Sequence, residues 1–128
     1  MTLNFVELQD MLEGMKELAN DKLPFKLSLL LAKNISLLDK EMEFYIKQEQ
    51  DFALKYLAVD ENGMFIQERE GVFKIKSGME DECRKDRAEL NQFTVNVDLK
   101  MIPMSLMENL VVTPKQLVAL ESILIEEE

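Results

Sequence analysis

Apolar residues recur every three or four positions in two stretches of the chain, and this spacing is typical of amphipathic helices. The first stretch runs from Val6 to Leu18 and predicts a helix with one buried stripe. Residues 2–5, just before it, are compatible with a short strand or with the cap of that helix. The apolar positions of the stripe are Leu8, Met11, Leu12, Met15 and Leu18.

The second stretch predicts a long helix at about residues 24–57, because neither glycine nor proline interrupts it after Pro24. About 33 residues at 1.5 Å each would give a rod of roughly 50 Å. A compact domain of this size is only about 30 Å across, so we expect something to pack along the helix. The apolar content of residues 27–38 predicts burial on nearly all sides, whereas the later half has one stripe. The main apolar positions are Leu27, Leu31, Leu38, Met42, Tyr45, Phe52 and Tyr56.

The segment after the long helix predicts a turn and a β-hairpin. The residues DENG at 60–63 are a turn signature, and two short apolar runs then predict a hairpin at about residues 64–76. Phe65 lies on one side of this hairpin, and the other apolar side chains lie across its turn. These are Val72, Phe73 and Ile75.

A charged helix is predicted at about residues 79–92. Ser77 and Glu80 have the spacing of a capping box at its start, and few apolar side chains follow. So polar a helix needs a partner, and the nearest one is the second half of the long helix. This pairing predicts a helical hairpin with the β-hairpin at its tip.

Strict alternation of apolar and polar residues predicts a strand at about residues 93–101. One strand is not stable alone, and three partners are open to it: residues 2–5, the β-hairpin, or a second copy of the chain. Further on, Thr113, Pro114 and Gln116 predict the start of a last helix at about residues 114–125. Its predicted buried stripe is Leu117, Leu120 and Leu124.

These elements predict a single domain, residues 1–128, of the α+β class and mainly helical. It combines a long helical hairpin that carries a small β-hairpin at its tip with a short antiparallel sheet and a C-terminal helix. No apolar run reaches the roughly 18 residues of a membrane span, and the start lacks the features of a secretory signal. The single cysteine, Cys83, cannot form an internal disulfide. We therefore expect a protein of the reducing cytoplasm that makes no membrane contact.

The charge balance argues against direct binding to nucleic acid. The chain carries 25 acidic and 15 basic residues, for a net charge of −10, whereas phosphate contacts require an excess of lysine and arginine. The plainer interpretation of this acidity is solubility. The alternative is docking onto a basic surface or mimicry of nucleic acid.

The residue inventory also argues against an enzyme. Histidine is absent, which removes His-dependent triads and the common zinc sites, and the four scattered glycines form no phosphate-binding loop. Carboxylates remain, but lysine and arginine are interleaved with them, as on a solvated surface. We expect no catalysis, no cofactor, no metal and no small-molecule substrate. The carboxylates considered are Asp39, Glu41, Glu43, Glu80, Asp81 and Glu82.

Two stretches, LAKNISLLDKE at 31–41 and TPKQLVALESILIEEE at 113–128, together with the order of elements, resemble small uncharacterised bacteriophage or prophage proteins. The resemblance covers most of the chain. It implies a phage origin and location in the cytoplasm of the host bacterium, with incorporation in the virion as an option. It assigns no activity and no functional residue.

From these observations we expect a small noncatalytic phage protein that acts through protein–protein contacts as a minor virion or assembly component. Its partner would be itself, as a homo-oligomer, or another phage or host protein. The alternative is an acidic inhibitor of a host defence or nucleic-acid enzyme. The glutamates that end the chain serve either solubility or contact with a basic partner. The candidate partner-binding residues are Phe65, Phe73, Ile75, Glu126, Glu127 and Glu128.

Overall fold

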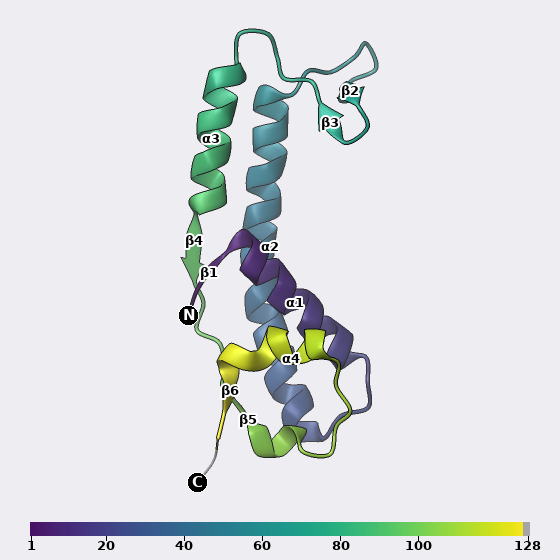
Figure 1. Ribbon diagram of the computed structural model, residues 1–128, viewed down its shortest axis with the longest axis vertical. Helices are drawn as coiled ribbons and strands as arrows, with labels where there is room; N and C mark the ends of the chain where they lie inside the picture. Colours follow the sequence, from purple (N-terminus) through teal and green to yellow (C-terminus); the bar gives the residue numbers. More distant parts are fainter. Residues whose placement is uncertain (127–128) are drawn as a thin grey trace. The chain divides into compact units, whose positions relative to one another are not determined.

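The computed structural model describes residues 1–126, in which four helices are joined by short strands and turns (Figure 1). This arrangement confirms the mainly helical α+β class that the sequence predicts. The helices are α1 (Phe5–Ala19), α2 (Phe25–Tyr56), α3 (Glu80–Gln92) and α4 (Pro114–Leu120).

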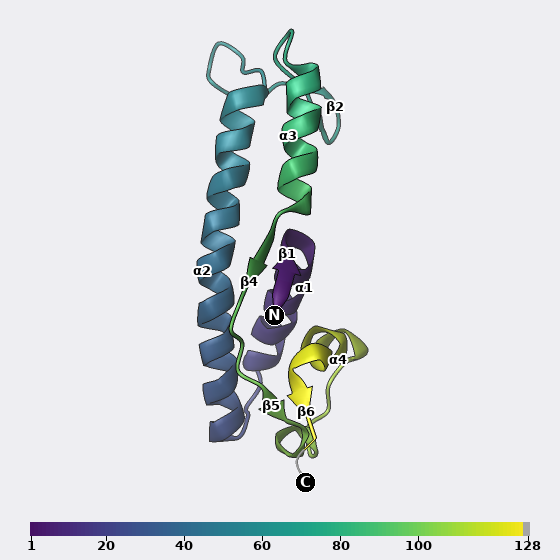
Figure 2. The same ribbon diagram turned by 90° about the vertical axis from the view of Figure 1, so that its left-hand side faces the viewer.

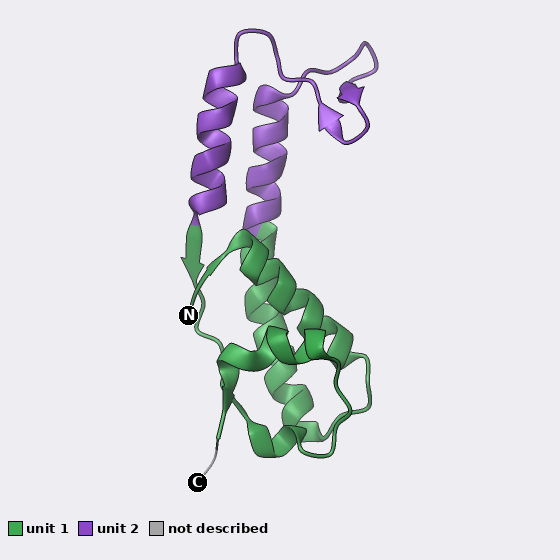
Figure 3. Ribbon diagram, viewed as in Figure 1, with its two compact units in different colours: residues 1–43, 94–128 green, residues 44–93 purple. Residues whose placement is uncertain are grey.

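Contacts within the chain group it into two compact units, where the sequence pattern predicts one domain (Figure 3). Unit 1 comprises residues 1–43 and 94–128, and unit 2 comprises residues 44–93. Helix α2 contributes residues 25–43 to unit 1 and residues 44–56 to unit 2.

Helix α1 supplies the largest share of the core of unit 1, as its apolar stripe predicts. All five predicted positions of that stripe are buried. Asn4 caps the helix: its side chain accepts a hydrogen bond from the Glu7 N–H, and the Glu7 carboxylate accepts one from the Asn4 N–H. Because residues Thr2–Asn4 also form strand β1, both sequence interpretations of this segment hold at once.

Strand β1 pairs with β4 (Thr94–Asn96) in an antiparallel ladder that aligns Thr2 with Asn96 (Figure 2). This pairing selects the first of the three partners considered. The predicted strand at 93–101 is too long, however, because β4 ends at Asn96. Just beyond it, the Val97 N–H donates to the Met1 carbonyl, and the Met1 amino group donates to the Val97 carbonyl.

A buried asparagine replaces the missing strand partner beyond that point. Asn34 of α2 is fully buried. Its amide donates to the Lys100 carbonyl at 2.9 Å, and its side-chain oxygen accepts from the Lys100 N–H at 2.7 Å. These two bonds satisfy backbone groups that no neighbouring strand reaches, and they hold Val97 and Leu99 in the core.

Helix α4 begins where the sequence predicts and ends earlier. Thr113 and Gln116 form the predicted capping box, with proline at the first helical position. The predicted end at residue 125 is wrong, because the chain tightens into a 3₁₀ turn (η2, Glu121–Ile123) after Leu120. Residues Leu124–Ile125 then form β6, which pairs in parallel with β5 (Ile102–Pro103). Another 3₁₀ turn, η1 (Met104–Met107), follows β5.

The predicted buried stripe of α4 is also shifted around the helix. Leu120 is fully buried, but Leu117 is 43% exposed, and Leu124 is half-buried. The reason is the crossing of α4 over α1. A side-chain Cβ placed on the buried Gly14 would stand 2.2 Å from the Cβ of Ala119, so the two helices touch through their smallest residues. That crossing turns Gln116, Ala119, Leu120 and Ile123 inward.

The part of α2 in unit 1 is buried along one face only, so the prediction of burial on nearly all sides is wrong. Leu27, Leu31 and Leu38 face the core, whereas Phe25 is 81% exposed and Leu29 is 42% exposed. Too few elements of unit 1 pack around this helix to cover its second face.

Unit 2 is the predicted helical hairpin with a β-hairpin at its tip (Figures 1 and 2). The β-hairpin pairs β2 (Gln67–Arg69) with β3 (Val72–Phe73). The predicted capping box at the start of α3 is wrong: Met79 is the N-cap, and no side chain caps the helix. Gly78, at φ +82°, turns the chain between Ser77 and the helix, which moves the serine away from the capping position.

Candidate functional site

The predicted partner-binding residues fall in both units. Phe65, Phe73 and Ile75 lie at the tip of unit 2, which we define as residues 57–76. Glu126 follows β6 in unit 1 and is exposed, and Glu127 and Glu128 lie outside the described residues. Because α4 ends at Leu120, Glu126 is not at a helix terminus. The tip is therefore the region where the structure brings predicted residues together.

The backbone of the tip is held by a closed ring of three hydrogen bonds. The Ala58 N–H donates to the Lys74 carbonyl at 2.9 Å, the Lys74 N–H donates to the Ile66 carbonyl at 2.8 Å, and the Ile66 N–H donates to the Ala58 carbonyl at 3.1 Å. Three chain segments thus meet in a triangle, and residues 57–59 add a third segment to the predicted two-stranded hairpin.

The DENG turn closes one end of this arrangement as predicted. The Asp60 carboxylate accepts hydrogen bonds from the N–H groups of Asn62 and Met64, and Gly63 has a positive φ, +78°. The Asp60 N–H in turn donates to the Met64 carbonyl at 2.8 Å. The turn is fixed by its own side chain and does not rely on packing.

The tip presents a patch of exposed apolar side chains, which we call the tip patch. Phe65 and Phe73 are 38% and 42% exposed, and their rings meet edge to face with centroids 6.2 Å apart. Val59 pairs with Phe65 across a β-bridge. The patch consists of Val59, Met64, Phe65, Val72 and Phe73, all of them exposed.

Three members of this patch are not among the predicted partner-binding residues: Val59, Met64 and Val72. Val59 directly precedes the DENG turn, and Met64 directly follows it. A signal was present, since apolar residues stand on both sides of the DENG turn and a hairpin brings the two sides together. Ile75, in contrast, is half-buried and forms a β-bridge with Leu57, so it does not belong to the exposed patch.

A groove of about 710 Å³ lies next to the patch in unit 2. Phe52 and Leu57 of the α2 side, Phe73 and Ile75 of the tip, and Cys83 of α3 line its apolar part. Cys83 is buried there. The groove can accept an apolar side chain of a partner next to the Phe65–Phe73 pair.

An ion pair at this groove links the two helices of unit 2. The Arg87 guanidinium contacts both oxygens of Glu49, at 2.6 and 2.9 Å, and it stacks over the Phe52 ring at 4.1 Å. The hydrogen bonds that Arg87 donates to Glu49 raise the pKa of Arg87 above its usual value. A planar guanidinium suits this combination of carboxylate and aromatic face better than an ammonium does.

A second polar link joins the helices through Tyr56. Its hydroxyl donates to Asp86, and the Lys55 ammonium lies 3.6 Å from the same carboxylate. The hydrogen bond from Tyr56, followed by the charge of Lys55, lowers the pKa of Asp86 below its usual range. The same hydrogen bond raises the pKa of Tyr56.

Replacing Asp86 with asparagine should weaken the acid dependence of stability. Because the pKa of Asp86 is lower in the folded chain than in the unfolded one, its contribution is full above about pH 4 and is lost as the pH falls through the folded pKa. Urea unfolding between about pH 5 and pH 2 should therefore show a shallower loss of stability in Asp86→Asn than in the wild type.

Tyr56→Phe serves as the second variant, because it removes the hydrogen bond that is the largest cause of the shift while keeping the ring. It should flatten the same acid limb. Parallel acid limbs for the wild type and both variants would contradict the assignment of this pH dependence to the Tyr56–Asp86 pair.

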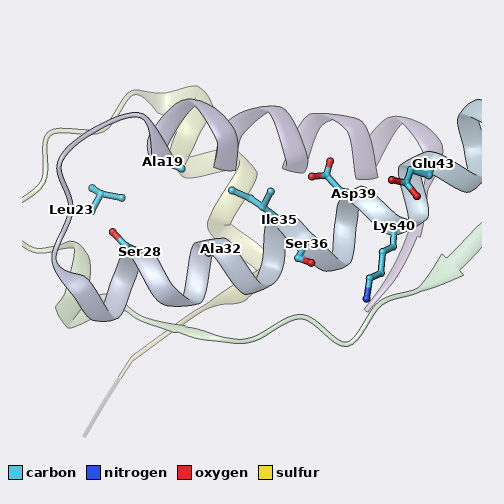
Figure 4. Close-up of a pocket in the computed structure, with 9 residues that line it drawn as sticks. All are labelled: Ala19, Leu23, Ser28, Ala32, Ile35, Ser36, Asp39, Lys40 and Glu43. Carbon is cyan, nitrogen blue, oxygen red and sulfur yellow. The ribbon is translucent and has the colours of Figure 1, made fainter.

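The carboxylates that were considered for catalysis are dispersed. Figure 4 shows Asp39 and Glu43 beside a groove of about 620 Å³ in unit 1, with Asp39 directed toward α1 and Lys40 away from it. Asp39 pairs with Lys16 at 3.0 Å, and Asp81 pairs with Arg84 at 3.6 Å. Among residues 1–126, no three carboxylate or cysteine side chains gather closely enough to hold a metal ion.

Comparisons with protein-family models, with curated proteins and with solved structures find no match for this chain. The resemblance to bacteriophage proteins therefore stays a prediction. None of the helices that the structure describes has the length and apolar content needed to cross a membrane.

Proposed function

We propose that this chain is a noncatalytic protein that acts through protein–protein contact, as a component of an assembly, and that the tip patch is its contact surface. The single observation that carries the proposal is the exposed Phe65–Phe73 pair. Two phenylalanines that share a ring contact at the surface, with three further exposed apolar neighbours, form the kind of apolar patch that marks interaction sites.

The distribution of buried residues in unit 2 supports the same function. Its buried apolar side chains, within residues 44–93, are Tyr45, Tyr56 and Cys83. Many large apolar side chains of this unit stay exposed instead, among them the tip patch. So small a core contributes little stability by itself, and apolar surface that the fold leaves open is available to a partner.

The backbone of the tip favours binding because it is already ordered. The ring of hydrogen bonds through Ala58, Ile66 and Lys74 fixes the segments that carry the aromatic pair. A partner then does not need to order these segments on binding, which reduces the entropic cost of association. The adjoining groove provides space for a protruding apolar side chain of that partner.

The test is a binding experiment with a partner that is first identified through the patch itself. A photo-crosslinking amino acid at Met64 captures the neighbouring protein in cells, and the purified protein is then titrated by calorimetry. Phe65→Ala with Phe73→Ala should weaken binding by about 2 kcal/mol or more, roughly 30-fold in Kd, because exposed aromatic anchors carry most of the energy of an interface.

Phe44→Ala is the matched control, since Phe44 is a phenylalanine of the same unit with 45% exposure. It should leave the affinity within about twofold. Equal losses in the control and in the tip variants, or no loss in either, would overturn the assignment of the tip patch.

The acidic inhibitor remains the second candidate, and one observation favours it. Glu80, Asp81 and Glu82 are all exposed in the first turn of α3. Their neutralisation (Glu80→Gln, Asp81→Asn and Glu82→Gln) should weaken binding to a basic partner and reduce the dependence of that binding on salt. The contact proposed for the tip patch depends on apolar area and should keep its affinity in these variants.

A further inference from the structure

A second groove of unit 2, which we call the aromatic groove, combines aromatic walls with carboxylates. Its volume is about 380 Å³. Phe52, Tyr56, Leu90 and Phe93 supply its apolar walls, and Phe52 and Tyr56 have ring centroids 5.0 Å apart. Phe93 is 44% exposed, so aromatic surface is open to solvent in this groove.

The charges that line the aromatic groove are mostly negative. Asp51, Asp86 and Glu89 stand in its lining against a single base, Lys55. Lys55 is paired with Asp86, whereas neither Asp51 nor Glu89 forms an ion pair with any residue from 1 to 126. The groove thus keeps two exposed carboxylates beside its aromatic rings, which is the chemistry that attracts an organic cation.

A cation of the chain itself already occupies part of this groove. The Lys55 ammonium lies 5.0 Å from the centre of the Tyr56 ring and 3.6 Å from the Asp86 carboxylate. Its side chain is 58% exposed, so a competing cation can displace it. This lysine is an observation independent of the carboxylates, because it shows a cation seated against the aromatic wall.

Another contact in the same unit indicates which cation fits best. Arg87 stacks over Phe52 at 4.1 Å while Glu49 binds its guanidinium through both oxygens. Phe52 lines both grooves. The aromatic groove repeats the same ingredients, an aromatic ring with nearby carboxylates, but without a guanidinium of the chain to fill it.

We propose that the aromatic groove binds an arginine side chain of a partner protein, with Asp51 and Glu89 as its carboxylates and the exposed Phe93 ring as its aromatic surface. Guanidinium groups combine stacking on aromatic rings with hydrogen bonds to carboxylates, and they lose less hydration on binding than an ammonium does. This site goes beyond the contact proposed for the tip patch, because it defines a charged residue of the partner.

The proposal also gives Lys55 a role. In the free chain it is paired with Asp86, and an incoming arginine competes with it for the carboxylates of the groove. Removing Lys55 should therefore strengthen the binding of arginine. Removing a lysine elsewhere on the surface would change this affinity only through long-range charge.

The experiment is a titration followed by the amide signals of the ¹⁵N-labelled chain in NMR. The probe is the peptide acetyl-Gly-Arg-Gly-Arg-Gly-amide, and the control peptide carries citrulline, a neutral isostere, in place of each arginine. We expect shifts that saturate and are centred on Gln48, Leu90 and Phe93, with no saturable shifts for the citrulline peptide. A lysine peptide of the same length should bind more weakly.

Isosteric variants then test the assigned residues. Asp51→Asn and Glu89→Gln should each lower the affinity for the arginine peptide by about two- to fivefold, as expected for exposed charge pairs. Lys55→Met should raise this affinity by a similar factor. The control Glu82→Gln removes an exposed carboxylate of α3 outside the groove lining and should leave the affinity within about 1.5-fold.

Shifts spread over the acidic surface, equal binding of the citrulline peptide, or an unchanged affinity in Asp51→Asn and Glu89→Gln would overturn the proposal. Tighter binding of the lysine peptide than of the arginine peptide would also overturn it, because the site would then select positive charge and not the planar guanidinium group. These outcomes are independent of the tip patch, which the peptide does not address.

Discussion

Replacing Asn34 with leucine should destabilise the chain by about 2–4 kcal/mol. Leucine has the same branched arrangement of side-chain heavy atoms as asparagine, although it is larger, and it makes neither of the hydrogen bonds that Asn34 forms with the Lys100 backbone. The N–H and the C=O of Lys100 both lose their partner, and each unpaired group costs about 1–3 kcal/mol where it is shielded from water. The gain from burying a leucine side chain offsets part of this loss.

Urea unfolding monitored by circular dichroism gives the change in free energy, and hydrogen exchange shows its origin. The Lys100 amide should exchange much faster in Asn34→Leu, while the amides in the middle of α3 should keep their relative protection. Asn91→Leu, at an exposed helical asparagine of α3, should change stability by no more than about 0.5 kcal/mol. Unchanged protection of Lys100 in Asn34→Leu would contradict the role assigned to this side chain.

Gly14→Ala should destabilise the chain by about 2–3 kcal/mol, even though alanine is the better helix former by about 1 kcal/mol. The added methyl group would stand 2.2 Å from the Ala119 Cβ, far inside van der Waals contact. Helix α4 would have to move away from α1, and such overpacking typically costs 1–3 kcal/mol and occasionally more. Thermal or urea unfolding measures the loss.

The matched test is an exchange of the two residues. Ala119→Gly alone should also destabilise the chain, by about 1–2 kcal/mol, because it removes a buried methyl group and lowers helix propensity. The double variant Gly14→Ala with Ala119→Gly moves one methyl group across the contact and should recover most of the stability lost in Gly14→Ala. Additive losses in the double variant would show that the crossing is not as close as the structure has it.

Much of the fold follows from local sequence signals. The stripe of α1, the capping box at Thr113 and the DENG turn were predictable, because each depends on residues a few positions apart. The helical hairpin was predictable because its two helices are neighbours along the chain. Most of the predictions that failed depend on distant residues. The extent of β4 depends on its pairing with β1, and the end of α4 on the pairing of Leu124 with Ile102. The capping box at Ser77 is a local failure, because Gly78 turns the chain before α3.

The same difference between local signals and long-range packing applies to the candidate sites. Phe65 and Phe73 were predicted because both belong to one hairpin. The aromatic groove was not, because Phe52 and Tyr56 look like an ordinary buried stripe of a long helix, and Asp51 and Glu89 look like solvated charges. Only the packing of α3 beside α2 places these rings and carboxylates in one lining.

The ring of hydrogen bonds through Ala58, Ile66 and Lys74 limits the ways in which a partner can bind the tip. An ordinary β-hairpin has two open edges, and a foreign strand can extend it by main-chain pairing, both in specific complexes and in aggregation. In this ring every one of the three residues both donates to a neighbour and accepts from one, so at that level there is no open edge. At these three residues the backbone is closed to β-sheet growth, so a partner contacts this part of the tip through side chains.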